Sequence, residues 1–521
     1  MTSDCTIAYM TMEMMIPEIP GFFRGGLGDL AGHTPGGLGK YCHAIPITYG
    51  YPRHWQTGKE INYREVPGTQ YLFSLDVNVY FPPKSFSIPI FGIDRGGVQT
   101  YLICPPADSL SNSQGDILYP SDNGISLEQS ALFGRAAEAL LMRLGIKPDI
   151  AWYQEWRAGM TAMPSIMVNP YFNGTKHLYT SHTSRPEALP KFPIEWYDGL
   201  SIGRQFYKDF LRGLIDPDHG CMVLADMVNG VSEEHGEVLC ASNPEQAYKI
   251  THALNAVDRD FALSNRLKLL DNPTPMQLFI AHHGDKGDLT NFVNSKADVS
   301  WTTDDFVVGL VRRLAKYKNQ HPMFETIIHN LVHMGMKVLI GGVAHENDFE
   351  CQQWAETFKQ WMEDPELKGK FVYIPEYDEN FRRLTTQGCD VWVECPWKRS
   401  EACGTGIFFA WINGNLVVST CGGGAKEHGT GIDAENGTGD CLYIEPYEPA
   451  TLEMQLQRMH DWYINWIDHG DELWLKLRSN AFEGGKRLVI EQMISRYTEN
   501  CFEPLLSLRE IPFLQEMFVA A

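Results

Sequence analysis

A run of basic side chains stands out in a chain that is otherwise acidic. The segment VRRLAKYK, residues 311–318, follows a β-rich run and places four cations within seven positions, at Arg312, Arg313, Lys316 and Lys318. Guanidinium and ammonium groups at the carboxyl end of a strand suit a phosphate or diphosphate. The alternative interpretation of this pattern is a solvated cluster on the surface.

A carboxylate followed by small residues forms the second candidate, in the segment SEACGTG. Glu401 can accept hydrogen bonds from sugar hydroxyls. The backbone N–H groups of Gly404, Thr405 and Gly406 open the apolar helix that follows, where they can face a phosphate. The alternative is that Glu401 only compensates the partial charge of the helix N-terminus.

The first half of the chain contributes a glycine-rich loop and a histidine. Gly25, Gly26, Leu27 and Gly28 lie between an expected strand and an expected helix, where glycines let backbone N–H groups approach an anion closely. A plain turn is the alternative for this loop. His182 ends the strand-like segment YTSHT, and a single histidine in such a place is more often structural than functional.

The elements that must position these residues alternate between strands and helices. In the second half we expect strands at 306–311, 337–343, 370–374, 390–394 and 415–420, and helices at 321–334 and 349–362. In the first half we expect strands at 6–11, 99–104, 150–154 and 177–181, and a helix at 127–144. The alternation predicts an α/β protein with two parallel sheets, and ligands of such sheets bind at the carboxyl ends of the strands.

The chain is too long for one hydrophobic core, so we expect two large domains. The polar stretch 284–303 is the expected linker, because the regular βα alternation begins just after it. We therefore predict an N-terminal domain at 1–295 on the acceptor side, a second domain at 296–449 on the donor and phosphate side, and a helical segment at 450–521 that packs back across the domains.

Composition excludes several classes of protein. A net charge of -22 opposes binding to nucleic acid or to an anionic membrane. The twelve cysteines include no C-x-x-C pair, which favours reduced thiols in a cytoplasmic protein. No apolar run approaches the length of a transmembrane helix and the N-terminus has no basic leader, so we expect a soluble, unprocessed chain.

These segments, in this order, resemble the glycogen, starch and maltodextrin phosphorylases, above all their short bacterial and archaeal forms. The resemblance is collinear from about Ala8 to Gly437. It implies a GT-B type fold, in which two Rossmann-like, doubly wound domains face each other across a cleft, with a helical C-terminal extension. The matching stretches are 8–13, 25–28, 182–183 with 186–190, 228–232 with His235, Asn255, 311–318, 401–406 and 413–414.

The resemblance implies roles for individual residues. His182 would contact the sugar, at its primary hydroxyl, and steady the charge that develops at the anomeric carbon. Arg313 and Lys318 would hold the phosphate, and the loop 26–28 would close over the anion. The sugar ring would be held by Glu401, Gly404 and Asn255.

One departure from the phosphorylases is informative. In that family a lysine eight residues beyond the glutamate forms the Schiff base with pyridoxal phosphate, and here the position is Phe409. No lysine lies between positions 401 and 420, and phenylalanine cannot form an imine. We therefore expect no pyridoxal phosphate and no other cofactor. No cluster of ligands with metal-binding spacing calls for a metal ion.

Other segments are closer to the starch synthases, which use nucleotide sugars. Gly26-Leu27-Gly28-Asp29 resembles their Gly-Leu-Gly-Asp, and Glu155-Trp156-Arg157 is nearer to their Asp-Trp-His block than to that of the phosphorylases. The synthase lysine two residues before the paired glycines is Phe23 here, with Arg24 one place nearer. A positively charged side chain is therefore present before the glycines, but one position closer to them than in the synthases.

The leading hypothesis is a retaining glycosyltransferase that moves a hexosyl unit, glucosyl by resemblance, from a nucleoside-diphosphate sugar to a hydroxyl acceptor. The second is a phosphorylase that uses phosphate and a sugar 1-phosphate without pyridoxal phosphate. The third is an inactive relative that binds a glycan or serves as a subunit, which the intact set of candidate residues argues against. The expected partners are the donor and a sugar or other hydroxyl acceptor, and the family's habit suggests a homodimer.

Overall fold

The computed structural model divides the chain into two compact units. Unit 1 comprises the residues up to Leu254 together with those from Met493 on, and unit 2 comprises Asn255–Gln492. The residues that the structure describes are 5–19, 25–54, 57–80, 83–113, 118, 120, 123–184, 189–193, 195, 214–345 and 348–508. Within these ranges no helix combines the length and the apolar character that crossing a membrane requires.

Unit 1 is built on a nine-stranded sheet with the order β11-β10-β7-β6-β1-β2-β5-β4-β3. Every pairing from β11 to β5 is parallel, and β4 and β3 are added antiparallel at one edge. The bounds are β1 Thr6–Thr11, β2 His43–Tyr49, β3 Thr69–Val79, β4 Lys84–Arg95, β5 Val98–Ile103, β6 Ile150–Gln154, β7 Lys176–Thr180, β10 Met227–Gly230 and β11 Ile250–His252.

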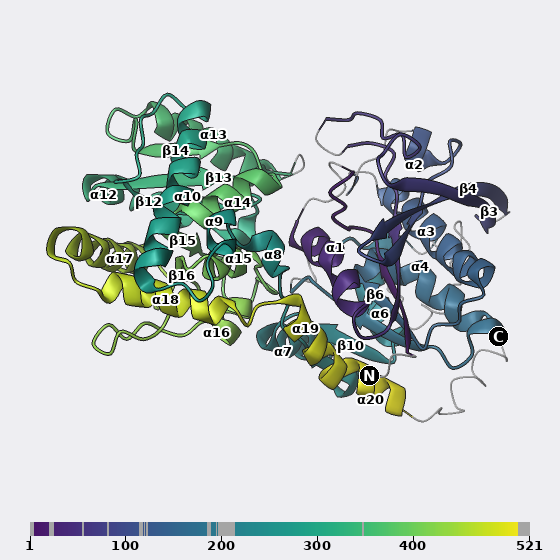
Figure 1. The fold of residues 1–521 in the computed structure, drawn as a ribbon. Coiled ribbons are helices and arrows are strands. Elements are labelled where there is room, and N and C mark those ends of the chain that lie inside the picture. Colours follow the sequence, from purple (N-terminus) through teal and green to yellow (C-terminus); the bar gives the residue numbers. More distant parts are fainter. Residues whose placement is uncertain are drawn as a thin grey trace. The chain divides into compact units, whose positions relative to one another are not determined.

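Helices connect the parallel strands of unit 1 (Figure 1). The main ones are α1 Gly26–Leu38, α3 Asn123–Leu144, α4 Glu155–Val168, α6 Pro217–Leu224 and α7 Glu233–Ser242. The end of the chain also belongs to this unit. Tyr497, which ends α19 (Ile490–Tyr497), packs on the indole of Trp152 in β6, with ring centroids 4.5 Å apart. The expected strands and the expected helix of this half are confirmed to within four residues at their ends, whereas β2, β3, β4, β10 and β11 of this sheet were not predicted.

Unit 2 is built on six parallel strands in the order β14-β13-β12-β15-β16-β17. This is the strand order of a Rossmann fold, in which the sequence of connections reverses between the first and the fourth strand. The bounds are β12 Phe306–Val311, β13 Met336–Gly341, β14 Phe371–Ile374, β15 Val391–Glu394, β16 Leu416–Ser419 and β17 Cys441–Tyr443. All five strands expected in this half are confirmed.

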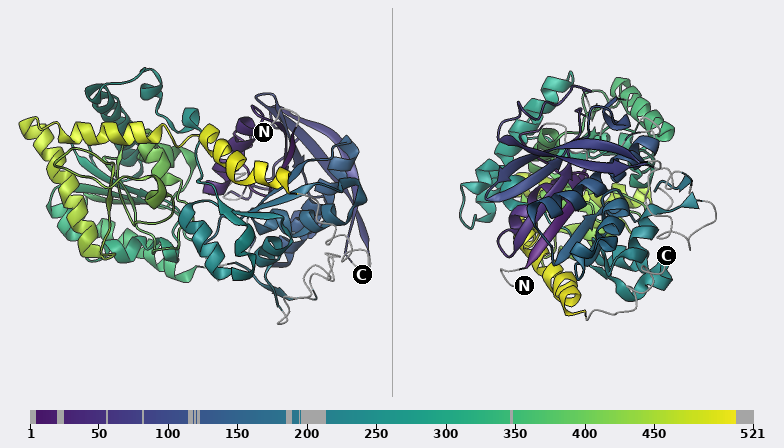
Figure 2. Two further views of the ribbon diagram at one scale, coloured as in Figure 1. Left: turned by 90° about the horizontal axis from the view of Figure 1, so that it is seen from below. Right: turned by 90° about the vertical axis from the view of Figure 1, so that its right-hand side faces the viewer.

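Helices cover both faces of the sheet of unit 2. On one face, a Cβ on Gly309 of β12 would meet Thr385 of α14. On the other, the ring of Phe306 contacts those of Tyr463 in α17 and Trp474 in α18. The helices α17 and α18 are the yellow-green pair beside this sheet in Figure 2. The bounds are α10 Pro275–Lys296, α13 Phe349–Glu363, α14 Glu379–Gly388, α15 Gly406–Ile412, α17 Pro449–His469 and α18 Leu473–Gly485.

Three expectations about this part of the chain need correction. The predicted helix at 321–334 is two short helices, α11 Gln320–Phe324 and α12 Ile328–His333. The polar stretch 284–303 is not a linker, because its first half belongs to α10. The two units divide at 254/255 and 492/493 rather than at 295/296 and 449/450, so α10, α17 and α18 all belong to unit 2.

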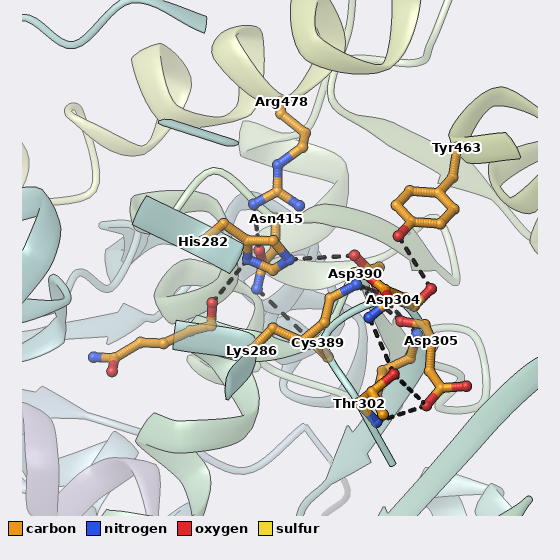
Figure 3. Close-up of polar contacts among 12 residues, drawn as sticks. His282, Lys286, Thr302, Asp304, Asp305, Cys389, Asp390, Asn415, Tyr463 and Arg478 are labelled. Atoms are coloured by element: carbon orange, nitrogen blue, oxygen red, sulfur yellow. Dashed lines mark hydrogen bonds and ion pairs between the residues drawn. The ribbon is translucent and has the colours of Figure 1, made fainter. Parts of the chain in front are cut away.

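The polar residues of α10 are buried as charged pairs, which explains why this helix resembles a linker in the sequence. The carboxylate of Asp390, 1% exposed, lies 2.7 Å from Nζ of Lys286 and 3.2 Å from Nε2 of His282 (Figure 3). Burial alone raises the pKa of Asp390, but Lys286 and His282 outweigh it and hold this pKa below its usual range. Burial and the nearby charge of Arg478 lower the pKa of His282 to about 4.

Candidate active site

Unit 2 gathers the predicted donor-side residues at the carboxyl ends of β12 and β15. These strands are neighbours in the sheet, and the chain leaves them toward opposite edges, so they mark the topological switch point where open α/β sheets bind ligands. Arg312 follows β12 directly, Glu394 is the last residue of β15, and Glu401 lies in the loop that leads to α15.

Four charged side chains, three buried and Glu401 half-buried, form one network at this point. Oε2 of Glu401 accepts hydrogen bonds from the NH2 group of Arg312, at 2.5 Å, and from Nζ of Lys318, at 3.1 Å. The NH1 group of Arg312 also lies 3.1 Å from Oε2 of Glu394. Burial raises the pKa of Glu401, but the charges of Lys318 and Arg312 outweigh burial and lower it to about 2. Glu401 is therefore an ionised acceptor at neutral pH.

The two oxygens of Glu401 differ in their surroundings. Among the hydrogen bonds and ion pairs of the described residues, both cations use Oε2 and none uses Oε1. A carboxylate fixed through one oxygen presents the other to a ligand in a defined direction. This arrangement suits an acceptor for sugar hydroxyls, as the sequence predicted for Glu401.

The small residues after Glu401 accommodate a second carboxylate. A Cβ on Gly404 would clash with Oε2 of Glu394, and a Cβ on Gly406 would come within 2.9 Å of its Oε1. The indole N–H of Trp392 donates to Oε1 of Glu394 at 3.3 Å. Thr405 lies between the two glycines and is buried. Glycine is therefore required at 404 and 406 in part because a larger side chain there would collide with Glu394.

The two adjacent arginines of the cation run have different environments. The side chain of Arg312 is buried in the charged network, whereas Arg313 is exposed and its backbone carbonyl accepts from the side chain of Gln320 at 3.0 Å. The sequence predicted roles for Arg313 and Lys318, included Arg312 only as a member of the cation run, and missed Glu394. Glu394 could have been identified from the sequence, because it is a carboxylate at the carboxyl end of an otherwise apolar strand.

Asn255 and the loop of Glu401 meet at Cys403. The backbone N–H of Asn255 interacts with the thiol of Cys403, two residues beyond Glu401. Asn255 is 3% exposed, and its Oδ1 has no hydrogen-bond partner among the described residues. An amide oxygen that is buried and unsatisfied beside this loop suits a hydrogen-bond donor of a ligand.

The position of the pyridoxal lysine is filled by packed side chains. Phe409 is fully buried in α15. The guanidinium of Arg382 stacks over its ring, 4.2 Å from the centroid, and the ring of Phe261 meets it edge to face at 6.1 Å. With no amine at 409 and with aromatic and guanidinium groups against the ring, the residues present do not fit a covalently held pyridoxal phosphate. Within the described ranges, no group of three His, Cys, Asp or Glu side chains is placed to hold a metal ion.

Unit 1 has its own switch point, between β1 and β6, and the glycine loop lies there. Glu13, two residues beyond β1, accepts the backbone N–H of Gly25 through Oε1 at 2.9 Å. Helix α1 then begins at Gly26, and the carbonyl of Gly28 accepts the N–H of Met15 at 2.8 Å. The buried carboxylate of Glu13 thus fixes the start of the glycine loop, with Leu27 in the first turn of the helix. Phe23 and Arg24 lie outside the described residues.

Glu155, at the end of β6, organises the histidine segment. Its backbone adopts the left-handed conformation with φ of 65°, which non-glycine residues rarely adopt and which is found preferentially at functional sites. Oε1 of Glu155 accepts the N–H of His182 at 2.7 Å and the hydroxyl of Thr183 at 3.2 Å. Burial raises the pKa of Glu155 to about 7. The sequence suggested no role for this residue, because its neighbours come together only in the sheet.

His182 is held as a neutral imidazole. Its Nε2 lies 2.8 Å from Oε1 of Gln154, and its backbone is held by Glu155. Burial, with a smaller contribution from His235, lowers the pKa of His182 to about 3. The structure thus brings together His182, Gln154 and Glu155 in unit 1. The segment 185–188, part of the matching stretch after His182, lies outside the described residues.

Comparisons with known proteins agree with this architecture. Residues 7–255 match the starch synthase catalytic domain family. The catalytic domain of starch synthase IV from Arabidopsis thaliana, solved with ADP and acarbose, superposes with a TM-score of 0.74, covering 97% of this chain and 99% of that one at 17% identity. The chain therefore has the GT-B fold, and its first half matches a family of glycosyltransferases.

Curated relatives combine the two resemblances noted in the sequence. The maltodextrin phosphorylase of Thermococcus litoralis is 25% identical over 545 aligned positions, which cover 85% of this chain and 63% of that enzyme. The glycogen synthase of Thermotoga maritima is 23% identical over 477, covering 88% of this chain and 91% of the synthase. The resemblance to phosphorylases, with synthase-like features, is thereby confirmed.

Proposed function

We propose that the chain is a retaining glycosyltransferase that moves a hexosyl unit, glucosyl in the first instance, from a nucleoside-diphosphate sugar to a hydroxyl acceptor without pyridoxal phosphate. The observation that carries the proposal is the combination of an intact ionised Glu401, held by Lys318, with a packed phenylalanine at position 409. The sugar-binding and cationic groups are retained, whereas the attachment point of the cofactor is replaced by a hydrophobic ring.

The residues of unit 2 would act on the donor. Oε1 of Glu401 would accept from hydroxyls of the transferred sugar, with Asn255 as a further contact. Lys318, Arg313 and the backbone N–H groups of the loop 404–406 would neutralise the phosphates as the glycosidic bond breaks. Stabilisation of the departing charge by such fixed groups is commonly the largest single contribution to catalysis.

Unit 1 contains the residues to which the family resemblance gives roles toward the sugar and the acceptor. His182, neutral and half-buried, would contact a hydroxyl of the sugar. Glu155, whose pKa is raised to about 7 by burial, can exchange a proton near neutral pH, as a group that accepts the proton of the acceptor hydroxyl must. The backbone N–H groups of the loop 25–28 would contact the anion.

Similar proteins support a nucleotide donor. The Arabidopsis starch synthase was solved with ADP and acarbose, and the chain covers nearly its full length. The glycogen synthases of Thermotoga are matched over most of their length as well. By contrast, the maltodextrin phosphorylase extends well beyond the aligned region.

The test is a binding panel with UDP, ADP, GDP, dTDP, glucose 1-phosphate, phosphate and pyridoxal phosphate, read by thermal shift and by visible absorption. A ligand at about 100 times its dissociation constant adds about 2.7 kcal/mol of stability, which such a shift detects. Stabilisation by a nucleoside diphosphate, without pyridoxal absorbance, is expected. Stabilisation only by glucose 1-phosphate or phosphate, or a bound pyridoxal chromophore, would reject the proposal.

The second candidate is a phosphorylase that uses phosphate and a sugar 1-phosphate. The similarity to maltodextrin phosphorylase across 85% of the chain favours it. Radiolabelled glucose 1-phosphate and a radiolabelled nucleotide sugar, each offered with a panel of acceptors, separate the two. Label reaches the product from only one of the donors, and that donor identifies the activity.

A further inference from the structure

The side chain of Glu394 lies where the sequence predicts a phosphate. The loop of residues 404–406 was expected to offer its small residues and backbone N–H groups to an anion. In the structure the carboxylate of Glu394 occupies the space that side chains at Gly404 and Gly406 would need. It is 3% exposed, and it is held by the NH1 group of Arg312 at 3.1 Å and by the indole N–H of Trp392 at 3.3 Å.

Charge within the network is balanced before any ligand binds. Arg312 and Lys318 supply two positive charges, and the carboxylates of Glu394 and Glu401 supply two negative ones. Burial raises the pKa of Glu394, and the charge of Arg312 opposes this rise. Arg312 contacts both carboxylates, so its guanidinium is shared between two anions of the protein. Interactions between such charges are strong because the site is largely removed from water.

Glu401 and Glu394 are not equivalent in this balance. Glu401 is bound by both cations and lies in the loop before α15, whereas Glu394 is bound by Arg312 alone and lies deeper, at the end of β15. Removing the charge of Glu394 would leave the contacts of Glu401 with Arg312 and Lys318 in place. The network would then carry one net positive charge.

We propose that Glu394 is a resident counter-anion that determines how strongly the donor site holds phosphate, and that it restrains the binding of diphosphates more than that of a single phosphate. The inference rests on the proposed function, because it assumes that these cations face the donor's phosphates. A diphosphate carries more negative charge than one phosphate, so the carboxylate repels it more. Glu394 thereby favours release of the leaving diphosphate after transfer.

The test compares the full-length chain with Glu394→Gln, which keeps the size and planar shape of the side chain and removes its charge. Isothermal titration at pH 7.5 measures the dissociation constants of ADP, UDP and inorganic phosphate. We expect Glu394→Gln to bind the preferred nucleoside diphosphate at least tenfold more tightly, and inorganic phosphate about threefold more tightly. Unchanged or weaker binding of both classes of anion would overturn the proposal.

Two further variants are controls. One tests whether the shape of the side chain at 394 matters, and the other tests whether the total charge of the protein matters. Glu394→Asp retains the carboxylate and is expected to bind within about threefold of the native chain. If it instead tightens binding as Glu394→Gln does, the effect comes from shape and the proposal is wrong. Glu350→Gln removes the same charge from a surface pair, 2.7 Å from Lys316 and 44% exposed, and is expected to leave all three constants unchanged.

The outcomes also distinguish this inference from the proposed function. If the native chain binds phosphate and no nucleoside diphosphate, the nucleotide-sugar donor is rejected, and Glu394 is judged by the phosphate constants alone. If a nucleoside diphosphate binds and Glu394→Gln leaves its constant unchanged, the proposed function stands and the role of Glu394 is rejected. If neither protein binds either anion, the network is not an anion site and the inference fails.

Discussion

Oε1 of Gln154 lies 2.8 Å from Nε2 of His182, at the carboxyl ends of two adjacent parallel strands of unit 1. In this orientation of the Gln154 amide its oxygen accepts the hydrogen bond, so Nε2 of the imidazole carries the proton. Nδ1 is then the unprotonated nitrogen. His182 therefore presents an acceptor to any hydroxyl that reaches Nδ1, and its low pKa, about 3, keeps it in this form across the physiological range.

Replacing Gln154 by glutamate should change the charge of His182. A carboxylate at 2.8 Å favours the imidazolium, so the pKa of His182 should rise and activity should be lost on the acid side of the pH profile. ¹⁵N NMR of histidine-labelled protein reports the tautomer directly, without any assumption about substrate. Gln353→Glu, the same change at an exposed position in α13, is the matched control and should alter neither readout. An unchanged His182 tautomer and pKa in Gln154→Glu would contradict this account.

Lys318→Ala should greatly weaken catalysis, because it removes one of the two cations that hold Glu401 and a charge near the expected phosphate. Loss of one such group commonly costs about 10²- to 10³-fold in turnover. Transfer activity at saturating and at low donor concentrations measures kcat and kcat/KM. Lys316→Ala, at an exposed position two residues away, is the control and should retain nearly native activity. Comparable losses in both variants would mean that Lys318 has no specific role.

Phe409→Ala should destabilise unit 2 without supplying any cofactor chemistry. The ring is fully buried between Arg382 and Phe261, and truncating a buried phenylalanine costs about 3 to 5 kcal/mol. Urea unfolding followed by tryptophan fluorescence measures the loss. Phe349→Ala serves as the control, since Phe349 is 75% exposed and its truncation should change the free energy of unfolding little. A change below about 1 kcal/mol at Phe409 would show that the pocket around it is loosely packed.

Stability should fall as the pH drops from about 6.5 toward 4, in part because of His282. Its folded-state pKa is lowered to about 4 by burial, whereas an unfolded histidine titrates near pH 6.5. As the pH falls, the unfolded state therefore binds a proton at this histidine before the folded state does. The contribution of neutral His282 to the free energy of unfolding is fully present above about pH 6.5 and is lost as the pH falls toward 4. One such group contributes a slope of about 1.4 kcal/mol per pH unit within that window.

The variant His282→Asn tests this slope. Urea unfolding at several pH values should give a smaller decrease between pH 6.5 and 4.5 than in the native chain, even though the variant is less stable at neutral pH. The adjacent His283 is exposed, so His283→Asn is the control and should leave the slope unchanged. An equal slope in the native chain and in His282→Asn would remove His282 as a source of acid sensitivity.

Much of the fold and part of the site could be predicted from the sequence. Many of the parallel strands that are buried on both faces appear as short apolar runs, so their positions could be predicted, although β2, β10, β11 and β17 were missed. The strands β3 and β4 were not predicted, although their alternation of exposed and buried positions is the pattern of a strand that is buried on one face. Helix α10 was taken for a linker because its buried residues are charged, and burial of a charge depends on a partner, such as Asp390, more than a hundred positions away.

The sequence by itself determined which residue types stand after each strand: the cations of 311–318, the carboxylate of Glu401, His182, and phenylalanine where a cofactor lysine would stand. Tertiary structure decided which of them meet. Arg312 rather than its neighbour Arg313 entered the buried network, since successive residues leaving a strand point to opposite sides. Glu394 joined it because adjacent parallel strands bring their carboxyl ends together, whatever their separation along the chain.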